Sequence, residues 1–208
     1  MSLLARAVIL ASGLLLAPLA QAQFLFGRLL PPAPALEANG PSNAPTVSAN
    51  GKVFAFSSSA TNWVPGSITG AKIISIDLVA GNVVNLSTTS GGTAFNGNSF
   101  APSTSRNGRY TAFETQANNL ELGVGTNGFQ VVRKDRQTGA VELASRATGP
   151  DGAGGKGRSY LARISDDGNV VGFISRAGID PADADGGESD VYIRDIAAGV
   201  TKLMTGGM

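Results

Sequence analysis

The sequence predicts an all-β protein with three four-stranded antiparallel blades of the β-propeller type, forming a half or incomplete propeller. Three observations predict it. One segment recurs three times, each copy holds four short runs rich in Val, Ile, Phe and Thr, and tight-turn residues separate these runs at the same places in every copy. Repeats of this length are typical of propeller or solenoid arrays. Four antiparallel strands in each repeat are typical of a propeller blade.

An Asn-Gly or Asp-Gly pair marks the first hairpin of each copy. The glycines of these pairs, Gly51, Gly108 and Gly168, are separated by 57 and 60 residues. Such pairs supply the positive φ angles of a tight hairpin, so a first strand should end at the serine that precedes each pair. The second strands predicted after the turns are VFAFSS (53–58), YTAFET (110–115) and VVGFIS (170–175), each with a phenylalanine at one fixed place (Phe56, Phe113 and Phe173).

An aspartate followed four residues later by a glycine marks the second hairpin of each copy. The pairs are Asp77 with Gly81, Asp135 with Gly139, and Asp195 with Gly199. An aspartate that accepts hydrogen bonds from turn amides, together with a left-handed glycine, is what a short hairpin requires. The predicted third strands are 72–77, 129–135 and 190–195, and the predicted fourth strands are 83–88, 141–146 and 200–205.

The chain is predicted to contain three regions. Residues 1–22 read as a signal peptide, because Arg6 and an apolar run precede the small-residue site Ala20-Gln21-Ala22. An uncleaved membrane anchor is the alternative. The apolar run is short and polar residues follow it, and both features disfavour an anchor. An apolar segment and a proline-rich linker follow at 23–44, and the blade domain covers 45–205, with blades at about 45–88, 98–147 and 159–205. We therefore expect a periplasmic or secreted protein without membrane contact after cleavage.

The repeat carries a family resemblance. The pattern Ser-x-[Asn/Asp]-Gly-x-x-x-x-Phe-x-[Ser/Thr]-x-Ala, closed by Asp-x-x-x-Gly, resembles the TolB-type (WD40-like) β-propeller repeat and occurs three times across residues 45–205. The resemblance implies a six-bladed ring and the bacterial cell envelope. Asn62 and Asn119 end the Ala-x-Asn segment that such repeats contain, whereas the third copy has Ile179 there. Propellers of this kind serve as scaffolds, binding platforms and accessory domains, so the resemblance says more about fold than about function.

Composition disfavours an enzyme. The chain has neither His nor Cys, which removes the commonest general base and metal ligand, thiol nucleophiles and disulfides. Arg6 is the one charged residue that cleavage after residue 22 would remove, which leaves 15 basic and 15 acidic residues. Because the cleaved chain would have no net positive charge, we expect no nucleic-acid partner. The sequence shows no catalytic constellation. We expect a non-enzymatic binding or scaffold module, without a cofactor, for a protein or glycan of the cell envelope.

One acidic loop has the ingredients of a calcium site. It contains Asp183, Asp185, Glu188 and Asp190 around glycines, and Ca²⁺ takes six to eight oxygen ligands. Because the spacing only partly matches a calcium loop, a solvated acidic turn with Asp190 capping the following strand is the interpretation we favour. The alternative function is an enzyme or accessory domain that acts on polysaccharide through these carboxylates. A single loop is a poor source of the two opposed carboxyl groups that glycoside cleavage needs.

The loops that leave the second strands are the expected contact surfaces, at about 60–71, 117–128 and 177–189, because rigid scaffolds commonly present variable binding loops. Within them, Trp63, Asn62 and Asn119 are the candidate binding residues, since an exposed indole can stack on a sugar or on a partner's side chain. A Gly-x-Gly-x-x-Gly match at 123–128 is interpreted as a loop, because a strand rather than a helix follows it.

Three blades would cover half of a six-bladed ring and leave two open faces. Three solutions remain: two copies pair as a homodimer that completes the ring, segment 24–30 covers one face, or the chain is a truncated remnant of a longer propeller protein. A twelve-stranded β-sandwich is the rival architecture. The near-constant repeat length disfavours it, because a sandwich does not need the same turn at the same place in every repeat.

Overall fold

The computed structural model describes residues 37–205 except 65, 67, 68, 121, 123–127 and 186, and within them the chain forms only strands, turns and loops. Among these residues, no helix is long and apolar enough to cross a membrane. The predicted signal peptide, the apolar segment 24–30 and nearly all of the glycine-rich match at 123–128 lie outside the described residues.

The strands form three four-stranded antiparallel sheets, each built from consecutive strands, as predicted. Blade 1 contains β1 (Ser42–Val47), β2 (Val53–Ser58), β3 (Lys72–Asp77) and β4 (Val83–Asn85). Blade 2 contains β5 (Ser99–Thr104), β6 (Tyr110–Thr115), β7 (Gln130–Asp135) and β8 (Val141–Leu143). Blade 3 contains β9 (Ser159–Ile164), β10 (Val170–Ser175), β11 (Asp190–Asp195) and β12 (Val200–Leu203).

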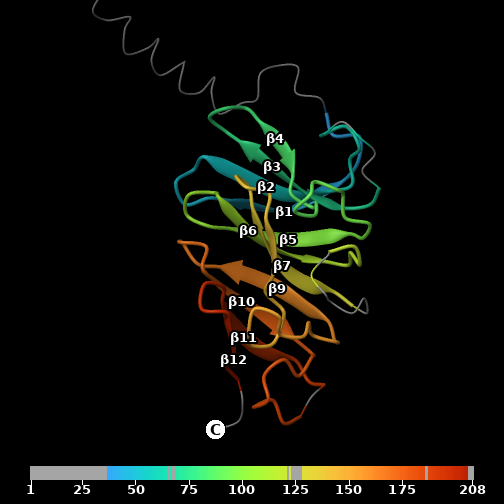
Figure 1. Cartoon of the computed structure of the whole chain (residues 1–208). Helices are drawn as coiled ribbons and strands as arrows, with labels where there is room; N and C mark the ends of the chain where they lie inside the picture. Colours follow the sequence, from blue (N-terminus) through green and yellow to red (C-terminus); the bar gives the residue numbers. More distant parts are fainter. Residues whose placement is uncertain are drawn as a thin grey trace, which may run out of the picture.

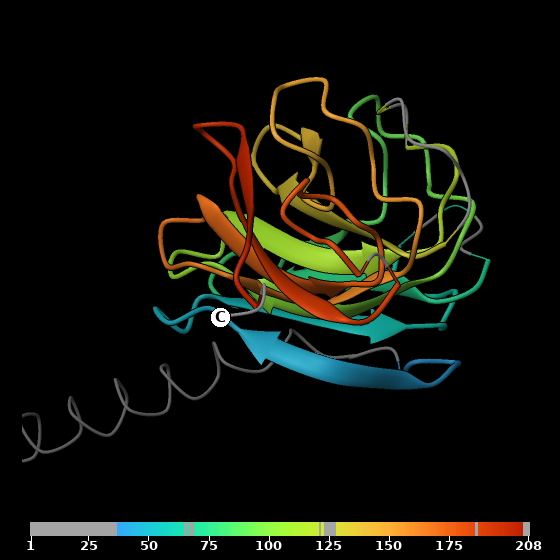
Figure 2. The same cartoon turned by 90° about the horizontal axis from the view of Figure 1, so that it is seen from below.

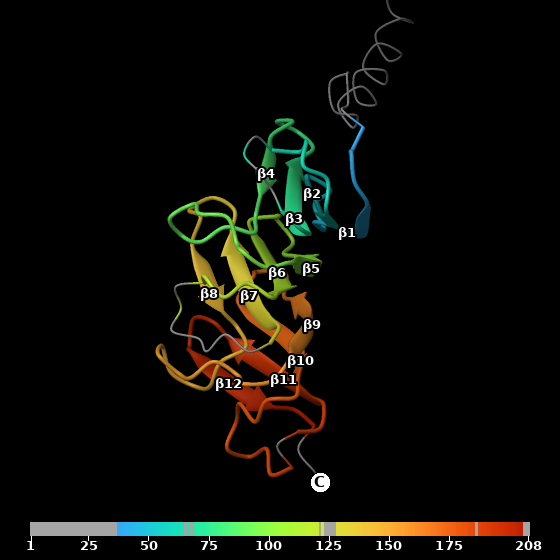
Figure 3. The ribbon, with the colours of Figure 1, turned by 90° about the vertical axis from the view of Figure 1, so that its right-hand side faces the viewer.

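The three blades follow one another as in part of a propeller (Figure 1). Their first strands, β1, β5 and β9, lie along one side of the molecule, and the fourth strands lie along the other (Figure 3). Seen from below, the blades overlap as successive layers (Figure 2). Each first strand has a bulge at the same place, where Ala44, Ala101 and Leu161 adopt φ angles of 50°, 49° and 55°.

The first hairpin turn is held by the same side-chain bonds in all three blades. In blade 1, the Ser48 hydroxyl donates to Asn50 Oδ1 (2.7 Å) and accepts a hydrogen bond from the Val53 amide (2.9 Å). Ser105 and Ser165 make the equivalent bonds in blades 2 and 3. The following glycines have φ angles of 68°, 76° and 80°. The predicted Asn-Gly and Asp-Gly turns are therefore confirmed.

The second hairpin also follows its prediction. Asp77 Oδ1 accepts hydrogen bonds from the amides of Val79 and Ala80, both at 2.9 Å. Asp135 and Asp195 accept turn amides in the same way. The glycines of the three pairs have φ angles of 74°, 79° and 67°. An aspartate and a left-handed glycine thus close each of these turns.

The fourth strands are shorter than predicted, at 83–85, 141–143 and 200–203 instead of six residues each. In blades 1 and 2, the reason is a serine that enters the backbone ladder. The Ser87 hydroxyl accepts the Ile73 amide (2.9 Å), and the Ser145 hydroxyl accepts the Val131 amide (3.0 Å). Because a side chain replaces the backbone acceptor, regular pairing stops there. At the other end of the domain, β1 begins at Ser42, within the segment assigned to the linker.

The core lies between the blades rather than inside any one of them. Phe113 of blade 2 packs into a cluster shared with blade 1, and Phe173 of blade 3 packs into a cluster shared with blade 2. Phe56, at the equivalent position of blade 1, belongs to a third cluster on the face that points away from blade 2. Within the described residues, no sheet covers that face.

Candidate functional site

An apolar cleft lies on the uncovered face of blade 1. We call this surface the open face of blade 1 and define it by its apolar side chains: Phe54, Phe56, Trp63, Ile74 and Ile76. A cavity of about 380 Å³ opens on it, bordered on one side by the segment that contains Ser42 and Asn43. Most of its lining is aliphatic or aromatic carbon, so it suits an apolar surface better than a charged ligand.

Trp63 lies at the rim of this cleft and is half-buried. Its ring meets Phe56 edge to face, with the ring centroids 5.2 Å apart and the planes at 69°. Its indole Nε1 donates to the Ser58 hydroxyl at 3.1 Å. Because the indole packs against its own blade and its N–H is already bonded, Trp63 extends an apolar surface rather than standing free in solvent.

Asn62 and Asn119 lie in equivalent places and bind equivalent parts of their own blades. The Asn62 side chain donates to Glu37 O (2.7 Å) and accepts the Asn39 amide (3.2 Å). The Asn119 side chain donates to Ala94 O (3.0 Å) and accepts the Asn96 amide (3.1 Å). Each asparagine thereby clamps the segment that leads into the first strand of its blade. The role of these two residues in partner binding stays a prediction.

Blade 3 lacks this asparagine clamp. Ile179 replaces the asparagine, and Lys156 stands where Asn39 and Asn96 stand in the other blades. A cavity of about 490 Å³ lies there, between the glycine-rich segment around Lys156 and the segment from Arg176 to Ile179. The departure from the repeat pattern that is visible in the sequence therefore coincides with a surface cavity in the structure.

The acidic loop brings three of its four predicted residues together. Carboxylate oxygens of Asp183, Asp185 and Asp190 lie within 4.8 Å of one another, whereas Glu188 is not part of this group. Loss of hydration and the neighbouring Asp190 and Asp183 carboxylates raise the pKa of Asp185. The three side chains gather on one side of one loop, so they do not face each other across a sugar as a glycosidase pair must.

Two of these carboxylates also fix the loop to blade 3. The Tyr192 hydroxyl donates to Asp183, and the Thr205 hydroxyl donates to Asp190 at 2.6 Å. Burial, followed by the Asp183 contact, raises the pKa of Tyr192, which therefore stays protonated and keeps donating. These contacts account for two of the acidic residues as structural groups. The calcium interpretation stays a prediction.

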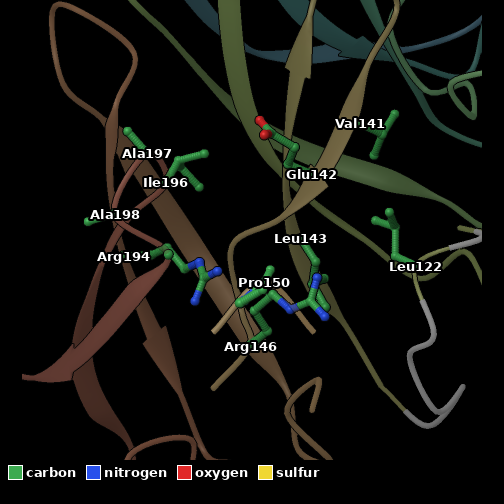
Figure 4. Close-up of a pocket in the computed structure, with 11 residues that line it drawn as sticks. Leu122, Val141, Glu142, Leu143, Arg146, Pro150, Arg194, Ile196, Ala197 and Ala198 are labelled. Atoms are coloured by element: carbon green, nitrogen blue, oxygen red, sulfur yellow. The ribbon is translucent and has the colours of Figure 1, made fainter. Parts of the chain in front are cut away.

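A third cavity, of about 440 Å³, lies between blades 2 and 3 and contains two arginines (Figure 4). We call it the arginine groove. Arg146 follows β8, and Arg194 belongs to β11. Burial and the neighbouring Arg146 lower the pKa of Arg194, so the two cations are close enough to repel each other. Sequence reasoning missed this site because the two residues are 48 positions apart and meet only once the blades pack.

Comparison with known proteins identifies structural neighbours only. No family model and no curated protein sequence matches the chain. Among solved structures, the chain is similar to TolB from Acinetobacter baumannii, with 18% identity, 81% of this chain and 33% of that chain covered, and a TM-score of 0.48. It is also similar to a putative TolB from Agrobacterium tumefaciens, with 19% identity, 78% of this chain and 48% of that chain covered, and a TM-score of 0.48. For the β-propeller domain of the Trilobed protease from Pyrococcus furiosus the values are 14%, 81%, 44% and 0.47.

The chain spans less than half the length of each of these three proteins. The neighbours also include proteases by name, among them the tricorn protease. The propeller-type architecture is evident from the three four-stranded sheets themselves. In that architecture the chain is similar to TolB and other propeller proteins.

Proposed function

We propose that the protein is an exported, non-enzymatic binding or scaffold module of the bacterial cell envelope, and that its open blade faces are its binding surfaces. The partner we assign to them is a second copy of the chain. One observation carries the proposal: blade 1 turns outward the same face that blades 2 and 3 bury against the blade before them.

The repeat makes this equivalence specific. Phe56 and Ile74 of blade 1 stand where Phe113 and Val132 stand in blade 2. Phe113 and Val132 have no exposed surface, because blade 1 covers them. Burial of apolar surface is worth roughly 25 cal/mol per Å². On the open face of blade 1, Phe56 and Ile74 are already buried, at 5% and 0% exposed, so the apolar surface that a second copy could still cover is that of the half-buried Phe54 and Trp63.

Blade 3 offers the complementary face. Val191 and Met204 occupy the positions that blades 1 and 2 turn toward the blade that follows them, and they are 40% and 55% exposed. Their equivalents in blade 1, Ile73 and Leu86, are buried. Two copies arranged head to tail would cover both kinds of face twice and close a ring of six blades, within the range of known propellers.

Export is supported by the sequence of residues 1–22, with its apolar run and small-residue cleavage site. A periplasmic or secreted location follows from it. A protein surface, rather than a glycan, is the favoured occupant of the open face of blade 1. The reason is that the Trp63 ring packs on Phe56 and presents an apolar cleft instead of a free stacking platform.

Light scattering after size-exclusion chromatography of residues 23–208 tests the pairing. The expected result is twice the mass of one chain. Val191→Asp should shift the equilibrium to single chains, because the new carboxylate would be buried at the joint but stays partly exposed in a single chain. Val79→Asp is the matched control: Val79 is 54% exposed on the β3–β4 turn, away from both open faces.

A single-chain mass at all concentrations would contradict the pairing. A stable dimer that survives Val191→Asp and Val79→Asp equally would contradict the assigned faces. Unchanged circular dichroism of both variants would show that the substitutions act on association and not on folding.

A further inference from the structure

The arginine groove has the size and lining of a small-ligand site. It lies between β8 of blade 2 and the β11–β12 hairpin of blade 3, with a volume of about 440 Å³. Leu122, Val141 and Ile196 supply apolar surface, and Arg146 and Arg194 supply charge (Figure 4). Ligand sites in proteins commonly combine a cavity of this size, apolar walls and a few polar groups.

Arg194 has a buried donor that no protein atom uses. Its side chain is deeply buried, with only 4% of the residue exposed. Nη1 donates to Ala147 O and Thr201 Oγ1, both at 3.0 Å, and Nη2 donates to Gly149 O at 3.1 Å. The Nε–H has no hydrogen-bond partner among the described residues. This N–H is itself buried, so Arg194 acts on the groove through its positive charge and not through this donor.

Arg146 adds a second set of unused donors. Its Nε donates to Gly152 O at 2.9 Å, while its two terminal nitrogens make no hydrogen bond to any described residue. Arg146 is half-buried and lines the same groove. A guanidinium fork binds a carboxylate through two parallel hydrogen bonds. The terminal nitrogens of Arg146 are free to do so.

Among the described residues that line the groove, Glu142 carries the one carboxylate, and it is already engaged. Arg133 binds Glu142 through Nε at 2.8 Å and through Nη2. Figure 4 shows the Glu142 carboxylate apart from both guanidinium groups of the groove. Glu142 therefore leaves the donors of Arg146 and Arg194 unpaired.

The equivalent joint between blades 1 and 2 shows that neither arginine is needed to join blades. There, Thr88 takes the place of Arg146, and Lys134 takes the place of Arg194. Lys134 Nζ donates to three carbonyl oxygens, Thr88 O (2.9 Å), Thr89 O (3.1 Å) and Gly139 O (2.6 Å), so all its protons are used. The joint between blades 2 and 3 thus has two arginines with unused hydrogen-bond donors, where the first joint has a lysine whose donors are all used.

We propose that the arginine groove binds a small monocarboxylate with an apolar body. Arg146 holds the carboxylate through its terminal nitrogens, and the Arg194 guanidinium, which lines the same groove, adds a second positive charge. The apolar part of the ligand lies against Leu122, Val141 and Ile196. This site does not involve the open blade faces, so the proposals of ligand binding and of pairing can be tested independently.

Calorimetric titration of the purified protein with phenylacetate tests the site, with phenylacetamide as the uncharged control of the same shape. We expect phenylacetate to bind and phenylacetamide to bind at least tenfold more weakly. Arg146→Thr restores the residue of the first joint, so the variant should fold, and it should weaken phenylacetate binding at least tenfold. Arg163→Thr removes an exposed arginine outside the groove and should leave binding unchanged.

Several results would overturn the assignment. Absence of phenylacetate binding at millimolar concentration, or equal binding of phenylacetamide, would rule out recognition of a carboxylate. Equal binding by the parent protein and by a folded Arg146→Thr variant would place the ligand elsewhere. Tighter binding of inorganic phosphate than of phenylacetate would show a phosphate site instead. Thermal unfolding of each variant verifies that it is folded.

Discussion

Asp135 shows how one residue of the repeat closes a turn and ties it to its own blade. Its Oδ1 accepts the amides of Gln137 and Thr138, and its Oδ2 accepts two hydrogen bonds from the Arg109 guanidinium, at 2.8 and 3.1 Å. Burial raises the pKa of Asp135, but the Arg109 guanidinium and the turn amides outweigh it and hold the pKa at about 2. The ionised form is therefore part of the folded structure.

This depressed pKa predicts a loss of stability in acid. The unfolded chain takes up the proton near pH 4, well before the folded protein does, so the contribution of Asp135 is complete above pH 4 and is lost between about pH 4 and 2. The difference is worth about 2 kcal/mol in the free energy of unfolding. Asp135→Asn should lower the stability at pH 7 and flatten its acid dependence. Urea unfolding at several pH values measures both, and parallel curves for the two proteins would contradict the assignment.

At the scale of the element, blades 1 and 2 each fasten the incoming segment with asparagine side chains. In blade 2, Asn119 holds Ala94 and the Asn96 amide, and the Asn118 amide in turn donates to Asn96 Oδ1 at 3.0 Å. Blade 1 repeats this arrangement with Asn62 and Asn39. The clamp fixes where the first strand begins, because the segment it binds leads directly into that strand.

Removal of the clamp should loosen one blade locally. Asn119→Ala deletes two hydrogen bonds to the backbone and should lower the free energy of unfolding by about 1–2 kcal/mol. Hydrogen exchange should become faster at the Asn96 amide, while the amides of β10 in blade 3 keep their protection. Equal acceleration in both blades would mean that the effect is global and that the asparagine is not a local clamp.

The turns were predictable from the sequence because their chemistry is local. Ser48, Asn50 and Gly51 interact across a few residues, so their pattern specifies the turn by itself. The end of β4 was not predictable in this way, because it depends on a bond between Ser87 and Ile73 of the neighbouring strand. The repeat also singled out Asn62, but its partners lie 23 and 25 residues away and only the fold brings them to it.

At the scale of the whole molecule, the joints between blades carry the fold and also differ from one another. The residue before the last aspartate of each third strand faces the preceding blade. In blade 2 this residue is Lys134, and in blade 3 it is Arg194. Each of them donates hydrogen bonds to carbonyl oxygens of the preceding blade. In blade 1 the residue at this position is Ile76, on the open face. The joint at blade 1 is therefore adapted to an apolar surface.

The turn glycines of the repeat allow a direct test of whether a second copy packs on the open face of blade 1. A Cβ at Gly108 would lie 2.3 Å from the Val53 side chain of blade 1, and a Cβ at Gly168 would lie 2.2 Å from the Tyr110 ring of blade 2. At Gly51 a Cβ meets nothing within 4 Å, because no blade precedes it among the described residues. In a ring of two copies, Gly51 would instead face Val170 of the second copy, which stands where Val53 and Tyr110 stand in their blades.

Gly51→Ala should therefore weaken association while it leaves the fold of a single chain intact. With φ at 68°, the alanine costs the single chain about 1 kcal/mol. In the ring, its methyl group would also collide with the second copy and raise the dissociation constant at least tenfold. Gly92→Ala has the same backbone strain, at φ 86°, equally open surroundings and a place away from both open faces, so it should not affect association. Sedimentation equilibrium separates the two variants, and identical dissociation constants would show that Gly51 does not face a second copy.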